Sequence, residues 1–200
     1  MSSTGATTPA WEQKLREDMA LSVSSLDITS AHSQDAMENA PFAAAMRSDD
    51  YPPQDSVRNQ LTSINVASVY HIQTATGTCI ETIRGLKNTQ PDRDAWNATI
   101  DGACQTASRS FSDRFHNAAD EAVQLIKALP PAQQNGAAKF MSESMGIVNR
   151  VVNKASSGLS SIDMRSIKDL LAGNWNRLAE VDNDVKAACS YAINALNAVF

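Results

Sequence analysis

The sequence has little charge, few aromatic residues and no long hydrophobic run. Charged residues make up 20% of the 200 residues and aromatic residues 6%, and the charged share is below the usual quarter. No stretch approaches the roughly 20 apolar residues of a membrane-spanning helix, so we expect no transmembrane segment. The hydrophobic share of 42%, much of it alanine, still exceeds that of a disordered chain. A chain of this length can bury a core of ordinary size.

Basic residues are few and scattered, which argues against nucleic acid as a partner. The formal net charge is −5, whereas phosphate binding needs clustered Lys and Arg. The same shortage disfavours an anionic membrane surface. No basic stripe is visible among the scattered side chains Lys14, Arg16, Arg84, Lys87, Arg109, Arg114, Arg150 and Lys154.

Metal-ligand spacing is missing from the cysteines and histidines. Cys79, Cys104 and Cys189 form no CxxC or Cys/His pattern, which excludes a recognisable zinc site. Their odd number leaves at least one thiol unpaired within a monomer. No HxxxH or ExxH spacing occurs, and a di-iron bundle would need paired ExxH motifs. We therefore interpret the three histidines as surface or boundary residues and expect no metal site; they are His32, His71 and His116.

Catalytic and cofactor motifs are missing as well. The chain has no GxSxG elbow, P-loop or GxGxxG, and the serines of residues 142–146 lie in helical sequence. We interpret the paired carboxylates at residues 49–50 and 120–121 as solvated charged residues, because general acid–base catalysis requires burial and converging partners. We expect no catalytic, cofactor-binding or metal-binding residue. An enzyme would need a site assembled from residues distant in sequence.

The first ten residues, MSSTGATTPA, lack the basic and apolar regions of a Sec signal peptide. Three origins stay open: a cytoplasmic protein, a secreted protein whose signal has been removed, and secretion by a leaderless route. We therefore expect a soluble protein that is cytoplasmic or secreted without a recognisable Sec signal. Residues 1–8 are interpreted as a disordered N-terminus.

Hydrophobic residues recur every three to four positions in most of the chain, which is the helical period. A first helix begins at Thr8-Pro9, weakens after Ile28 and stops by Pro41, and a linker follows at about residues 41–53. A second helix carries a stripe from Val57 to Leu86. Its polar face includes Arg58, Asn59, Asn65, Gln73 and Glu81.

Three further helices follow. The third opens at residues 90–92 and ends at the double proline 130–131. The fourth starts between Ala132 and Ala137 and stops at Gly158. Ser160 and Asp163 have capping-box spacing. From Met164 the fifth helix runs to the end with near-heptad spacing over about five heptads, the longest stripe of all.

Short connections force neighbouring helices to be antiparallel, and no strand signal competes. The sequence therefore predicts an all-α fold, an elongated antiparallel bundle of four to five long helices, in one domain over residues 9–200. The second and third helices are joined by a short connection and should run antiparallel. Cys79 and Cys104 lie near the apolar stripes of these two helices at similar distances from that connection, so we expect them to be neighbours. Whether they are bonded stays open. Cys189 is then the lone thiol, buried and inert.

Two functions from different classes fit this sequence. The first is a non-enzymatic bundle, secreted or effector-like, that acts by binding a protein partner or by self-assembly. The second is an apolar-ligand or lipid-surface binder, favoured by low charge and by a methionine-rich interior. In composition alone, without any motif, the chain is similar to exchangeable lipid-coating helical proteins and to bacterial secreted helical proteins. The methionines concerned are Met19, Met37, Met46, Met141, Met145 and Met164.

Overall fold

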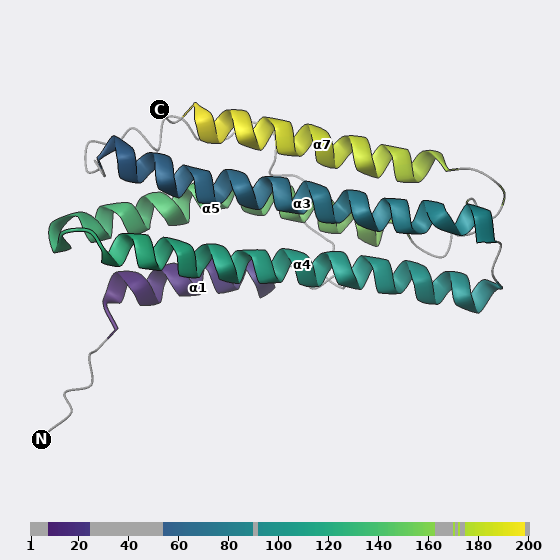
Figure 1. Cartoon of the computed structure of the whole chain (residues 1–200), viewed down its shortest axis with the longest axis horizontal. Helices are drawn as coiled ribbons and strands as arrows, with labels where there is room; N and C mark the ends of the chain where they lie inside the picture. Colours follow the sequence, from purple (N-terminus) through teal and green to yellow (C-terminus); the bar gives the residue numbers. More distant parts are fainter. Residues whose placement is uncertain are drawn as a thin grey trace, which may run out of the picture.

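The computed structural model describes residues 8–24, 54–89, 92–162, 170, 172 and 175–198, and the regular structure in this part of the chain is entirely helical. The helices lie side by side and give an elongated bundle (Figure 1). This confirms the predicted all-α antiparallel bundle. The described helices are α1 (Ala10–Ser24), α3 (Asp55–Thr89), α4 (Arg93–Lys127), α5 (Pro131–Ser160) and α7 (Asn176–Asn197).

Four long helices run in alternating directions along the bundle, in the order α3, α4, α5 and α7 (Figure 1). At about 1.5 Å per residue, the 35 residues of α3 and of α4 each reach roughly 50 Å. The turn between α4 and α5 is only three residues long, which forces these two helices to be antiparallel. The short helix α1 lies outside the four, against α4 and α5.

The central helix is α3, which packs against α4, α5 and α7. It therefore buries more of its circumference than the single stripe that the sequence predicted. Thr62, Val69, Thr76 and Ile80 are buried in addition to that stripe. The assignment of Asn65 to the polar face was wrong, because this side chain is fully buried.

The starts of α4 and α5 follow local chemistry. Asp92 caps α4, and its Oδ1 accepts a hydrogen bond of 2.8 Å from the Ala95 backbone N–H. Pro131 is the first residue of α5, slightly before the predicted start. Proline suits this position because the first N–H of a helix has no intrahelical partner.

Gly158 does not stop the helix, contrary to the prediction. Helix α5 continues to Ser160, and Gly158 instead lies against α7. A Cβ atom at this position would be 2.8 Å from Cγ1 of Val181, closer than atoms can pack. The glycine is therefore a contact residue that lets the two helices approach.

The predicted fifth helix was wrong at its start. The described helix α7 begins at Asn176 and has 22 residues, about three heptads and not five. Trp175 precedes it with φ −97° and ψ 6°, and its ring is tilted against that of Trp96 at a centroid distance of 6.1 Å. Ser160 is not an N-cap, because it lies in α5 and its Oγ donates to the Ser156 carbonyl at 2.7 Å.

Several sequence predictions lie outside the described residues. They concern the N-terminal residues 1–7, the end of the first helix after Ser24, the linker at 41–53, and residues 163–169 with the proposed cap Asp163.

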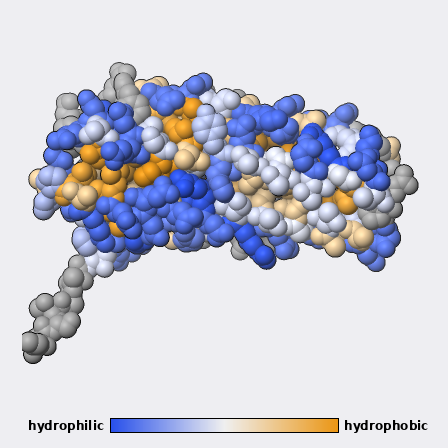
Figure 2. Space-filling model, in the orientation of Figure 1, coloured by the Kyte–Doolittle hydropathy of each residue, from blue (hydrophilic) through white to orange (hydrophobic). Residues whose placement is uncertain are grey.

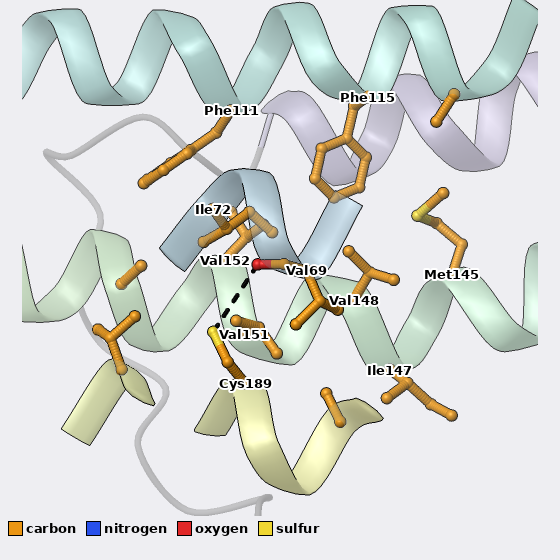
Figure 3. Packing of buried hydrophobic residues seen from close by; sticks show 14 of the residues in the cluster. Val69, Ile72, Phe111, Phe115, Met145, Ile147, Val148, Val151, Val152 and Cys189 are labelled. Atoms are coloured by element: carbon orange, nitrogen blue, oxygen red, sulfur yellow. Dashed lines mark hydrogen bonds between the residues drawn. The ribbon is translucent and has the colours of Figure 1, made fainter. Parts of the chain in front are cut away.

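The core is built from aliphatic side chains, two buried phenylalanines of α4 and the thiol of Cys189 (Figure 3). Cys189 is fully buried on α7, and its Sγ lies 3.8 Å from the Val69 carbonyl oxygen on α3. Burial raises the pKa of this thiol to about 11. Because the thiolate is the reactive form, burial and the raised pKa both disfavour reaction of Cys189 near neutral pH. The predicted burial of Cys189 is confirmed, but it is not the lone thiol, because Cys79 and Cys104 also carry free thiols.

Candidate functional site

The contact between α1 and the rest of the bundle is the feature that most resembles an interface. Two apolar side chains of α1, Leu15 and Met19, are almost fully buried against α4 and α5. Trp11 packs beside them and is partly buried.

Polar links surround this apolar centre, beginning at the first turn of α1. Trp11 Nε1 donates a hydrogen bond of 3.1 Å to Oε1 of Gln134 on α5. Glu12 Oε2 lies 2.7 Å from Nζ of Lys127 on α4. The first turn is thus held to both helices, next to the turn that joins them.

The polar links continue along α1. Arg16 Nη1 pairs with Asp120 Oδ1 of α4 at 2.7 Å, and Ser142 Oγ of α5 donates to Asp18 Oδ2 at 2.8 Å. An apolar centre with a polar, partly exposed rim is the anatomy of a protein–protein interface. Here the interface lies within one chain.

Glu12 is the most buried charged residue of this contact, with 6% of its side chain exposed. The hydrogen bond from Lys127 lowers the pKa of this carboxyl; burial opposes that effect, and Arg16 adds to the lowering. The pKa therefore lies below the usual value of 4.5. Glu12 stays ionised while α1 is docked at neutral pH.

A shallow groove lined by polar and charged residues lies on another seam, between α3 and α4. Its volume is about 450 Å³, and His71 Nε2 lies 2.7 Å from Ser110 Oγ at its edge. Nucleophilic use of such a pair requires a third group that orients the histidine. Among the described residues no side chain bonds the other ring nitrogen of His71. The groove is lined by His71, Thr106, Arg109, Ser110, Asp113, Arg114 and Asn117.

A network around Arg114 closes one side of this groove. Arg114 donates to Ser68 Oγ at 3.0 Å and to the Ile64 carbonyl at 3.1 Å, and it pairs with Glu121 at 2.8 Å. The guanidinium is thus engaged by α3 and by its own helix. We interpret the groove as a polar seam that fixes the α3–α4 hairpin.

A second groove, of about 410 Å³, lies between α3 and α7 and is also lined mostly by polar and charged residues. Exposed Tyr70 lies beside it, at 54% exposure. On the face shown in Figure 2, hydrophobic residues gather where α3 begins and α4 ends, and hydrophilic residues dominate elsewhere. The second groove is lined by Tyr70, Gln73, Thr74, Gly77, Glu81, Asp182 and Lys186.

Residues singled out from the sequence take mostly structural places. His71 and His116 are exposed, as interpreted, and the described methionines Met19, Met141 and Met145 belong to the core. The serine-rich stretch 142–146 is helical. The positions outside the described residues are His32, Met37, Met46, residues 49–50 and Met164.

The predicted neighbours Cys79 and Cys104 meet across the α3–α4 seam. Their Sγ atoms are 3.8 Å apart, and both residues carry free thiols. The hairpin register derived from the sequence is therefore confirmed.

The fold and the α1 contact define a class: an antiparallel bundle of four long helices with a short helix docked on one face. No protein-family model matches the chain, and neither a curated protein nor a solved structure matches it. Within the described ranges, no helix combines the length and apolar character needed to cross a bilayer. In the same ranges, no three His, Cys, Asp or Glu side chains are grouped to hold a metal ion.

Proposed function

We propose that the chain is a non-enzymatic protein-binding module, and that it binds an amphipathic helix in the groove between α4 and α5 that α1 occupies. The observation that carries this proposal is the interface-like anatomy of the α1 contact. Binding of a helix through its apolar face in a groove is a recurrent mode of protein recognition. A partner helix would replace α1.

The short length of α1 supports an exchangeable occupant. An isolated helix of about 15 residues is marginally stable in water, so α1 depends on the groove for its structure. Among the α1 side chains that the structure describes, at residues 10–20, Leu15 and Met19 are the two most buried apolar ones. The chain between α1 and α3 covers residues 25–54, which could span about 100 Å if extended. A competing helix could therefore displace α1 without unfolding the other helices.

The alternatives have less support. An apolar-ligand binder needs a concave site lined predominantly by hydrophobic side chains, whereas the two grooves described above are shallow and lined mostly by polar and charged residues. An enzyme would have the His71–Ser110 contact as its strongest starting point, and that contact lacks an orienting third group among the described residues.

A peptide-binding experiment tests the proposal. A full-length variant with Leu15→Asp and Met19→Asp releases α1, because two charges would have to be buried. A labelled peptide of residues 8–24 should bind this opened chain and bind the unaltered chain much more weakly. Circular dichroism shows whether the remaining helices stay folded. Absence of peptide binding by a folded, opened chain would contradict the proposal.

A charge exchange identifies the groove as the binding site. Lys127→Glu in the opened chain should weaken the peptide, because it places two carboxylates where Glu12 meets Lys127. A peptide with Glu12→Lys should restore binding to that variant. The matched control is Lys186→Glu on α7, an exposed lysine that likewise loses an ion pair, with Asp182, and this change should leave peptide binding unaltered. Capture with the opened chain, followed by mass spectrometry, then identifies natural helices that compete with the peptide.

A further inference from the structure

The two thiols on the α3–α4 seam lie at a distance from which a bond can form. Cys79 Sγ donates a hydrogen bond to Cys104 Sγ, and the atoms are 3.8 Å apart. The contact of His71 with Ser110, further along the seam, holds the same antiparallel register. The thiols are therefore held together by the hairpin itself and meet whenever it is folded.

We propose that Cys79 and Cys104 form a redox-active dithiol that a peroxide converts into an interhelical disulfide. Cys104 is the thiol that attacks the peroxide, and Cys79 is the thiol that then attacks the oxidised Cys104 sulfur. This inference is independent of the proposed function, because it concerns the α3–α4 seam and not the α4–α5 groove.

The two thiols differ in exposure, which assigns their roles. Cys79 is 3% exposed, whereas Cys104 is only partly buried and can be reached from solvent. The hydrogen bond donated by Cys79 stabilises the Cys104 thiolate and lowers its pKa. The same hydrogen bond, together with burial, raises the pKa of Cys79. The accessible thiol is thus also the one favoured as a thiolate, the form that reacts with peroxides.

The chemistry balances in two steps. The Cys104 thiolate attacks one oxygen of hydrogen peroxide, the O–O bond breaks, and Cys104 sulfenic acid and hydroxide form. The Cys79 sulfur then attacks the Cys104 sulfur, the S–O bond breaks, and the Cys79 proton leaves with the oxygen as water. After the hydroxide takes up the proton released by Cys104, two thiols and one peroxide have given one disulfide and two waters.

The bond would join two long helices within one hairpin. A disulfide needs an S–S separation of about 2.05 Å, so the sulfurs must move together from 3.8 Å. Ala75 lies one turn before Cys79 on α3 and Ala103 directly precedes Cys104 on α4, and both are small and partly buried. The closed loop spans 25 residues of sequence separation, and closing it restricts the unfolded chain. The oxidised protein should therefore unfold at a higher temperature.

Cys189 supplies an internal control. It is fully buried, its thiol faces the Val69 carbonyl, and its pKa is raised to about 11. It should stay reduced under conditions that oxidise the pair.

The experiment treats the folded full-length protein with a small excess of hydrogen peroxide and then alkylates it under denaturing conditions. Oxidation should remove two hydrogen atoms from the mass of the protein. After alkylation, the oxidised protein should carry one alkylated cysteine and yield a disulfide-linked peptide containing Cys79 and Cys104. Its thermal midpoint should be several degrees above that of the reduced protein. A folded protein that keeps three free thiols, or that oxidises through Cys189, would overturn the proposal.

Single substitutions then test the order of attack. In Cys79→Ser the Cys104 sulfenic acid should accumulate and react with dimedone, whereas Cys104→Ser should give no dimedone adduct at Cys79. Cys189→Ser should form the disulfide like the unaltered chain. The reverse pattern, with Cys79 forming the adduct, would overturn the assigned roles. Because the disulfide map uses the unaltered chain, the proposal stays testable even if a variant fails to fold.

Discussion

Asn65 on α3 donates a hydrogen bond of 2.6 Å from its side-chain nitrogen to Ser144 Oγ on α5, and both residues are buried. Ser144 in turn donates to the Phe140 carbonyl at 2.7 Å. The pair connects two helices through the apolar interior. A buried polar contact of this kind can fix the register of a helical bundle, because other registers leave the polar groups unpaired.

Ser144→Ala should lower the free energy of unfolding by about 1–3 kcal/mol, since it leaves the Asn65 amide without its partner in an apolar environment. The measurement is urea unfolding followed by circular dichroism. Asn65→Leu combined with Ser144→Ala should regain part of this loss, because neither polar group then stays buried and unpaired. If Ser144→Ala unfolds at the same urea concentration as the unaltered protein, the hydrogen bond contributes no net stability.

Acid should release α1 before the rest of the bundle unfolds. The pKa of Glu12 is lowered in the folded state, so its stabilising contribution is fully present above the ordinary value of 4.5 and is lost as the pH falls through the lowered value. The Trp11 indole N–H, which donates to Gln134, reports on docking in ¹H–¹⁵N spectra. Its resonance should move toward that of a free indole below about pH 4.5.

The control for the acid experiment is Glu12→Gln. This variant should dock α1 more weakly at neutral pH and should show a smaller change of the Trp11 resonance between neutral and acidic pH. A pH response as large as that of the unaltered chain would assign the transition to another group.

Substitution of two helical glycines by alanine should have opposite effects. Gly158→Ala should destabilise the protein by about 1–3 kcal/mol, because the new methyl group overlaps Val181 on α7. Gly102→Ala on α4 should stabilise it by up to about 1 kcal/mol, since its Cβ would meet no atom within 4 Å and alanine favours the helix. Thermal unfolding of both variants measures the difference in sign.

The double variant Gly158→Ala with Val181→Ala isolates the contact. Removal of the Val181 methyl groups makes room for the new Cβ, so the two changes together should cost less than the sum of the single changes. Strict additivity would mean that the helices move apart and that no local overlap occurs.

Leu178→Ala should lower the free energy of unfolding by about 2–5 kcal/mol, because this side chain on α7 is fully buried and its loss leaves a cavity. Leu125→Ala on α4 is a matched control with a smaller expected loss, since Leu125 is only partly buried. Denaturation midpoints compare the two. An unchanged midpoint for Leu178→Ala would show that the hydrophobic stripe of α7 contributes no core.

The sequence allowed prediction of the helix class and of the α3–α4 register because both depend on local signals. Apolar spacing marks one face of each helix, and the short connection near residue 90 sets the hairpin that brings Cys79 to Cys104. The proline-rich turn after α4 gave its boundary for the same reason. These features need no knowledge of which helices pack together.

Features that depend on packing order could not be predicted. Asn65 is polar in type and lies off the main stripe, so its burial follows only from the position of α5 against α3. Gly158 has the residue type of a helix stop, and only its contact with Val181 reveals its role. The partners of Glu12 and Arg16 on α4 lie over a hundred positions away, and no local pattern identifies them.

The central position of α3 has a consequence for synthesis of the chain. Ribosomes make α3 before α4, α5 and α7, so its buried residues wait for three later helices. Val69 and Ile80 on this helix are fully buried in the folded protein, and they stay exposed to solvent until the helices that cover them have been synthesised. A nascent chain therefore exposes the hydrophobic surface of α3 for much of its translation, and exposed surface of this kind is what chaperones protect.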